Sequence, residues 1–135
     1  MISRRFVLGI TAVAILSATA SPVLAVSRRN AAMRMLDTDN DGTLDLAEAK
    51  KAASAVFARL DRDHDGTLDR RELRGRLSAS EFAAADPDHD DTLTMEEYLG
   101  LVERRFNAAN PDKDGTLDAK ELNTSAGRAL LRLLR

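Results

Sequence analysis

The stretch DTDNDGTLDLAE, at residues 37–48, decides the fold because it recurs three times without gaps. The other copies are DRDHDGTLDRRE (61–72), DPDHDDTLTMEE (86–97) and NPDKDGTLDAKE (110–121). All 22 acidic residues of the 135-residue chain follow Ala25, and 20 of them lie in these four windows. Like charges packed this closely repel unless a counter-charge binds. The repeat therefore predicts cation sites.

The spacing within each window has a chemical reason. Carboxylates at positions 1, 3 and 5 converge on a hard cation as the chain curls around it, and a glutamate at position 12 adds two oxygens. Position 7 offers a backbone carbonyl, and glycine at position 6 permits a turn with positive φ. This is the pattern of an EF-hand loop, and four copies in register make it specific. Leucine at position 8 predicts a short strand bridge between paired loops.

The expected metal ligands are the residues at positions 1, 3, 5, 7, 9 and 12 of each loop. They are Asp37, Asp39, Asp41, Thr43, Asp45 and Glu48; Asp61, Asp63, Asp65, Thr67, Asp69 and Glu72; Asp86, Asp88, Asp90, Thr92, Thr94 and Glu97; and Asn110, Asp112, Asp114, Thr116, Asp118 and Glu121.

The four loops are not equivalent. Loop three has Asp91 at position 6, where a non-glycine residue costs roughly 1 kcal/mol. Loop four begins with Asn110, whose amide oxygen can ligate but brings no charge, so we expect the weakest site there. Position 9 has two interpretations, because its side chain either ligates, directly or through water, or caps the helix that follows.

The loops begin only 24 or 25 residues apart, which leaves no room for two helices and a linker between them. Residues 49–60 and 98–109 each predict one helix shared by adjacent hands. A helix of about 15 residues is roughly 22 Å long and places its two loops at opposite ends. Between loops two and three, Gly75 is a stop signal and Ser78 to Glu81 form a capping box that restarts a helix.

The predicted fold is all-α: a compact four-EF-hand helical bundle at residues 26–135, with helices shared between adjacent hands and the metal loops at the periphery. An antiparallel arrangement puts loop two beside loop three and loop one beside loop four; the alternative pairs one with three and two with four. The expected core comprises Met33, Leu36, Val56, Phe57, Leu60, Leu73, Leu77, Phe82, Leu99, Val102, Phe106 and the leucines of the C-terminal segment.

Residues 1–25 read as an export signal, with Arg4 and Arg5 before an apolar stretch and a small residue, Ala25, where a peptidase would cut. The alternative is a membrane anchor, although the stretch is short for a span. The run around the two arginines resembles a twin-arginine signal, and an ordinary secretory signal is the other interpretation. Cleavage removes two basic and no acidic residues, so the net charge falls from −2 to −4. We expect a periplasmic protein.

Composition excludes several classes of function. The chain has no cysteine, hence no disulfide, thiolate metal site or cysteine nucleophile. Its two histidines, His64 and His89, stand at loop position 4, where we expect solvent exposure. No nucleophile–base pair or phosphate loop is apparent, so we expect no enzyme, and the charge balance argues against nucleic-acid binding. No stable membrane anchor is expected after cleavage, and no protein partner can be named.

The C-terminal segment, residues 126–135, alternates leucines with arginines. We expect a final helix that docks its leucines on the core. A basic helix lying on a membrane surface is the alternative.

Taken together, the compact period, the export signal, Pro87 and Pro111 at position 2, aspartate at position 9 and the opening Asn110 resemble the lanmodulin family. The similarity covers residues 30–135. It implies a small periplasmic protein that binds lanthanide(III) ions in preference to calcium and folds on binding them. By match, the family's ligands in loop one are Asp37, Asp39, Asp41, Asp45 and Glu48, and loop two follows the same scheme. The sequence departs from the family at Thr38 and Arg62 in position 2, and at Asp91 and Thr94 in loop three.

Charge arithmetic leaves the identity of the ion open. Each of the first two loops offers five carboxylates. Such a cluster attracts a trivalent ion more strongly than Ca²⁺, but the trivalent ion also loses more hydration energy. We expect lanthanide(III) or Ca²⁺, up to four ions per chain, with a calcium buffer or sensor module as the alternative function. Repulsion within the loops and a small core predict that metal binding is coupled to folding.

Overall fold

The computed structural model describes residues 31–135; the expected export signal lies outside the described residues. Residues 31–36 are helical and lead into loop one. The elements that follow are β1 (Leu44–Asp45), α2 (Leu46–Leu60), β2 (Thr67–Asp69), α3 (Ala79–Ala85), β3 (Thr92–Thr94), α4 (Met95–Ala109), β4 (Thr116–Leu117), the 3₁₀ helix η1 (Glu121–Asn123) and α5 (Ser125–Leu131).

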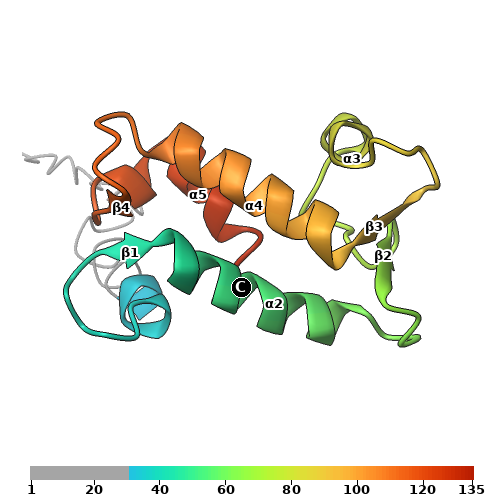
Figure 1. The fold of residues 1–135 in the computed structure, drawn as a ribbon, viewed down its shortest axis with the longest axis horizontal. Coiled ribbons are helices and arrows are strands. Elements are labelled where there is room, and N and C mark those ends of the chain that lie inside the picture. The colour runs from blue at the N-terminus through green and yellow to red at the C-terminus, as the bar shows by residue number, and fades with distance from the viewer. Residues whose placement is uncertain (1–30) are drawn as a thin grey trace, which may run out of the picture.

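Two 15-residue helices, α2 and α4, form the body of the molecule. Helix α2 runs from loop one to loop two, and α4 runs from loop three to loop four, as the sequence predicts. Each is closed at its start by a capping box, Asp45 with Glu48 in α2 and Thr94 with Glu97 in α4. The two helices lie side by side and antiparallel (Figure 1), and Lys50 of α2 pairs with Glu103 of α4 at 2.7 Å.

Paired loops meet through two short antiparallel sheets at opposite ends of these helices (Figure 1). Strand β1 pairs with β4, with Leu44 opposite Leu117, and β2 pairs with β3, with Leu68 opposite Leu93. The expected pairing of loop one with loop four and loop two with loop three is therefore confirmed, and the alternative pairing is wrong. All four position-8 leucines are fully buried, so each sheet also anchors its loops to the core.

The expectation of an all-α fold needs correction, because these sheets make the structure mostly helical rather than wholly so. Extended backbone at positions 7 and 8 lets two loops satisfy each other's backbone groups and bury both leucines. Loop two is also followed by turns rather than by a helix. Gly75, at φ 80°, stands in those turns, and Ser78 then caps α3 as predicted.

The core includes most of the predicted residues together with several others, and three of the predicted residues are only partly buried. Tyr98 and Leu101 of α4 are buried, whereas Leu60, Leu77 and Leu99 are only partly buried. The inward face of α4 is rotated relative to our expectation, because Tyr98 reaches across to the C-terminal segment. Its hydroxyl donates to the Leu133 carbonyl at 2.8 Å, and its ring meets Phe57 edge-on with centroids 5.7 Å apart.

The C-terminal leucines dock as expected. Helix α5 packs against α4, and the leucines at 130, 131, 133 and 134 are all buried. Gly127 lets α5 also pack closely on η1, since a Cβ there would lie 2.2 Å from the carbonyl oxygen of Glu121. Within residues 31–135, no helix combines the length and the apolar character that crossing a bilayer requires.

Candidate metal sites

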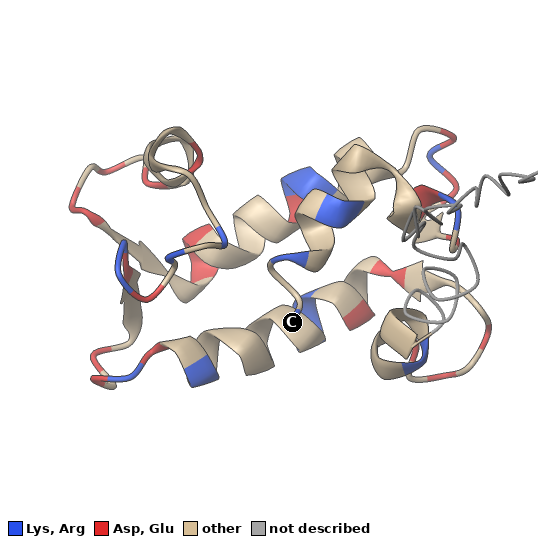
Figure 2. Cartoon of the chain, turned by 180° about the vertical axis from the view of Figure 1, so that it is seen from behind, with Lys and Arg blue, Asp and Glu red and all other residues tan. Residues whose placement is uncertain are grey.

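The first three loops each gather three carboxylates from positions 1, 3 and 12. In each group the oxygens that could bind an ion all lie within 4.8 Å of one another. The groups are Asp37, Asp39 and Glu48; Asp61, Asp63 and Glu72; and Asp86, Asp88 and Glu97. Most acidic residues accordingly lie on the loops at the two ends of the molecule (Figure 2), and Glu103 in the middle of α4 is an exception.

The carboxylate at position 1 is buried in each group, and in loop one Glu48 is buried too. Asp37, Asp61 and Asp86 are 8%, 9% and 2% exposed. In loop one the two oxygens of Asp37 accept hydrogen bonds from the backbone N–H groups of Asp41, at 3.2 Å, and Gly42, at 2.9 Å. Loops two and three repeat both bonds. A buried carboxylate is ordinarily paired with a positive charge or bound to a metal, and backbone N–H groups supply only partial charge here.

The glutamate at position 12 belongs to the loop and to the helix at once. Glu48 stands at the third position of α2, where its carboxylate accepts the N–H of Asp45, and Asp45 accepts the N–H of Glu48 in return. Glu97 makes the same exchange with Thr94. A carboxylate at a helix N-terminus is stabilised by the helix dipole. This explains why the chain can hold the glutamate against the other acidic groups.

The side chains at positions 5 and 9 accept hydrogen bonds from other residues of their own loop. The carboxylates at position 5, those of Asp41, Asp65, Asp90 and Asp114, each accept the N–H and the hydroxyl of the threonine at position 7. The side chains at position 9 each accept the N–H of the position-12 glutamate. Asp45 and Thr94 thereby cap α2 and α4, whereas Asp69 is followed by turns and Asp118 lies before the N-cap of η1. The hydroxyl of the position-7 threonine is a contact that the sequence analysis missed, because only its carbonyl was considered.

Repulsion within the groups raises the pKa of the aspartate at position 3. The backbone N–H of Asp41 lowers the pKa of Asp39, but partial desolvation and the charges of Asp41 and Glu48 outweigh it and leave the pKa raised. The pKa of Asp63 is raised by the equivalent interactions. In loop three the interaction with Asp86 is the largest effect raising the pKa of Asp88. A bound cation would remove this repulsion.

Loop four differs from the other three. The described residues form no group of three carboxylates there, because Asn110 replaces the first aspartate. Asn110 is 5% exposed, and its Oδ1 atom is the one buried side-chain oxygen or nitrogen in residues 31–135 that lacks a hydrogen-bond partner. An unpartnered buried amide oxygen is costly, and a ligand at loop four would satisfy it.

The position-4 residues complete the loop geometry. Asn40, His64, His89 and Lys113 all have positive φ, between 56° and 62°. All four residues are exposed to solvent, as predicted for both histidines.

Comparison with known proteins agrees with this geometry. The family model described as EF hand matches residues 30–51 and 54–78, which contain loops one and two. No curated protein matches the chain. The matches and the three acidic groups support an EF-hand superfamily protein that binds metal. The EF-hand is in general a metal-binding fold without catalytic activity. Loops three and four lie outside the matched residues and carry the pattern by sequence and geometry alone.

Proposed function

We propose that this chain is an exported protein that takes up hard multivalent cations in its acidic loops, orders on binding them, and selects lanthanide(III) ions. The observation that carries the proposal is the convergence of three carboxylates within 4.8 Å in each of three loops. None of the ion pairs within residues 31–135 involves these carboxylates. Carboxylate and carbonyl oxygens are the donors that hard cations prefer.

The donor set fits such an ion. Positions 1, 3 and 12 already converge, and the carboxylates at position 5 are held only by one neighbouring threonine each. Binding would require those position-5 carboxylates to turn inward. The ion would supply the positive charge that the buried aspartate at position 1 lacks. The unpartnered oxygen of Asn110 supports a fourth, weaker site.

Selectivity for lanthanides rests on the resemblance to the lanmodulins, because the number of carboxylates in each loop does not decide between the ions. The EF-hand match and the acidic groups are equally consistent with Ca²⁺, and a calcium buffer or sensor is the second candidate. The two functions separate in one titration. La³⁺ and Ca²⁺ are added in parallel to the secreted form while helical circular dichroism is followed. We expect La³⁺ to order the chain at much lower free concentration; equal responses at micromolar Ca²⁺ would contradict lanthanide selectivity.

Two adjacent glutamates give a matched control for this titration. Glu97 belongs to the loop-three group, whereas its neighbour Glu96 is exposed and outside the group. Glu97→Gln should lower the metal stoichiometry or weaken one site, and Glu96→Gln should bind as the unaltered chain does. If both variants bind alike, loop three is not a site.

We further propose that the protein acts in the periplasm after removal of residues 1–25. Arg4 and Arg5 support export by the twin-arginine route. Export of a variant with both arginines changed to lysine should stop; unaffected export would leave only the ordinary secretory route.

A further inference from the structure

Each sheet brings position 10 of one loop close to position 6 of its partner loop. At the β1–β4 end, Leu46 (position 10 of loop one) and Gly115 (position 6 of loop four) line one hollow of about 330 Å³. At the β2–β3 end the same two positions carry Arg70 and Asp91. An apolar residue facing glycine is thus replaced by an ion pair, with 3.0 Å between Arg70 Nη2 and Asp91 Oδ1.

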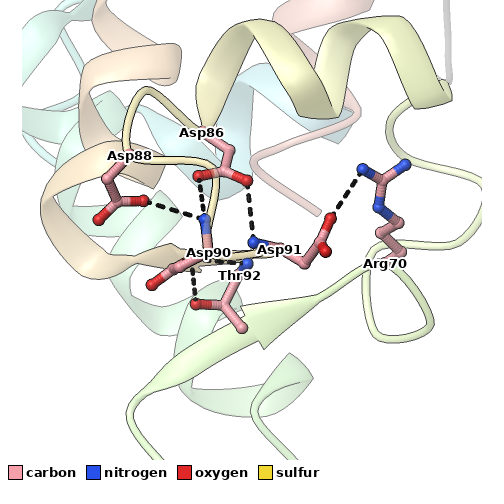
Figure 3. Close-up of polar contacts among 6 residues, drawn as sticks. All are labelled: Arg70, Asp86, Asp88, Asp90, Asp91 and Thr92. Carbon is pink, nitrogen blue, oxygen red and sulfur yellow. Dashed lines mark hydrogen bonds and ion pairs between the residues drawn. The ribbon is translucent and has the colours of Figure 1, made fainter.

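Asp91 keeps the backbone of the glycine that it replaces. Its φ is 66°, and its N–H donates to Asp86 Oδ2 at 3.1 Å, as the N–H of Gly66 donates to Asp61. Its carboxylate is not part of the ligand group; it points away from Asp86 and Asp88 toward Arg70 (Figure 3). This side chain therefore adds a negative charge to the turn of loop three without adding a ligand.

Arg70 makes a second contact, with the helix that leads into loop three. Its guanidinium lies over the ring of Phe82, 4.8 Å from the centroid. Phe82 is buried in α3, one turn before Asp86, so it belongs to the helix that enters loop three. One arginine from loop two thus contacts both the helix that leads into loop three and the turn of that loop. An exposed ion pair alone contributes little, but stacking on an aromatic ring adds a second, independent contact.

We propose that Arg70 is a positioning residue for the metal site of loop three: it neutralises and orients Asp91 while it fixes Phe82, and it thereby makes the affinity of loop three depend on a side chain of loop two. This inference rests on the proposed function, namely metal binding at loop three. Arg71 provides a matched comparison. It is adjacent to Arg70 and exposed, and its side chain makes no polar contact within residues 31–135.

The test is a La³⁺ titration of the full secreted chain, with free ion set by a chelator and each loop followed by NMR through its position-6 amide. Residue 91 reports on loop three and Gly42 on loop one. Loss of the positive charge alone would strengthen cation binding at loop three. Because Arg70 also positions Asp91 and Phe82, Arg70→Gln should instead weaken loop three about three- to tenfold, the size of a stacked ion pair, and leave loop one unchanged; stronger binding would contradict the positioning role. Arg71→Gln should change neither, and Arg70→Lys should restore part of the affinity.

A second background separates positioning from general electrostatics. With Asp91→Gly, the turn no longer needs an arginine, so Arg70→Gln should then change loop-three affinity less than about twofold. If Arg70→Gln and Arg71→Gln weaken loop three equally, or if Arg70→Gln weakens loops one and three equally, the positioning role is wrong. If the amide of residue 91 never responds to La³⁺ in the unaltered chain, it is the proposed function of loop three that fails.

Discussion

Changing Gly127 to alanine has two opposite effects on stability: alanine favours the helix, but its Cβ clashes with neighbouring backbone atoms. Gly127 lies in α5 with ordinary helical backbone, so propensity alone favours alanine by about 0.5–1 kcal/mol. A Cβ at this position, however, would lie 2.2 Å from the Glu121 carbonyl oxygen and 2.5 Å and 2.6 Å from backbone atoms of Leu122. These are backbone atoms of η1 and cannot rotate away. Forced overpacking of this kind costs about 1–3 kcal/mol, and more where backbone must move.

We therefore expect Gly127→Ala to destabilise the metal-free chain by a net of about 2 kcal/mol, because three backbone contacts outweigh the gain in propensity. The melting temperature should fall by roughly 10 °C for a domain of this size. Because the displaced segment begins with Glu121, the glutamate of loop four, affinity at loop four should fall as well.

Thermal unfolding followed by circular dichroism at 222 nm measures this change, and Gly100→Ala is its control. Gly100 also lies inside a helix, but its nearest neighbour to a new Cβ is the end of the Arg104 side chain at 4.0 Å. The control should therefore gain about 0.5–1 kcal/mol from propensity. Equal stabilisation by both alanines would refute the packing of α5 on η1.

Three further predictions test the core and the loops. Tyr98→Phe removes the hydroxyl that donates to the Leu133 carbonyl and should lower the free energy of unfolding in urea by about 1–2 kcal/mol; no change would mean that the bond is absent in solution. Because the pKa of Asp39 is raised above 3.8 in the folded chain, its ionisation destabilises the metal-free fold as pH rises through that raised value. Asp39→Asn should therefore raise the melting temperature in chelator at pH 7 and lose this advantage below pH 3.8; an advantage that persists at low pH would rule out charge repulsion as its cause. Asn110→Asp should strengthen metal binding at loop four roughly tenfold in a calorimetric titration, and unchanged binding would show that loop four is not a site.

The sequence was sufficient for the elements whose signals are local. The capping box at Ser78, the stop near Gly75 and the two long helices follow from residue types within a few positions of each other. Helix length excluded pairing between two loops that share a helix, because a helix of 15 residues cannot bring its own two loops together. It left two arrangements open, and the strand pairings in the structure decide between them.

The features that the sequence did not supply depend on distant contacts. The burial of Tyr98 is decided by a carbonyl 35 residues away, and the need for glycine at position 127 is decided by the backbone of η1. The pairing of Arg70 with Asp91 depends on the register of β2 with β3. Helical periodicity carries none of this information.

The position-9 question shows a different limit. In the structure Asp45 caps α2 and Thr94 caps α4, as one of the two interpretations expects, whereas Asp69 and Asp118 make the same hydrogen bond without capping a helix. Capping uses one carboxylate oxygen and leaves the other free, so ligation by the same residue stays a prediction. The sequence predicts the position of the carboxylate, but whether its second oxygen is a ligand depends on the bound ion.

The central claim is that the acidic loops exist to enclose multivalent ions and that binding them orders the chain. The most direct measurement compares the secreted form in excess chelator with the same sample after stepwise addition of La³⁺, by far-ultraviolet circular dichroism and by thermal melting. The account predicts a gain of helical signal and a higher melting temperature that saturate at a fixed number of ions per chain. Identical spectra and identical melting in the two conditions would contradict it.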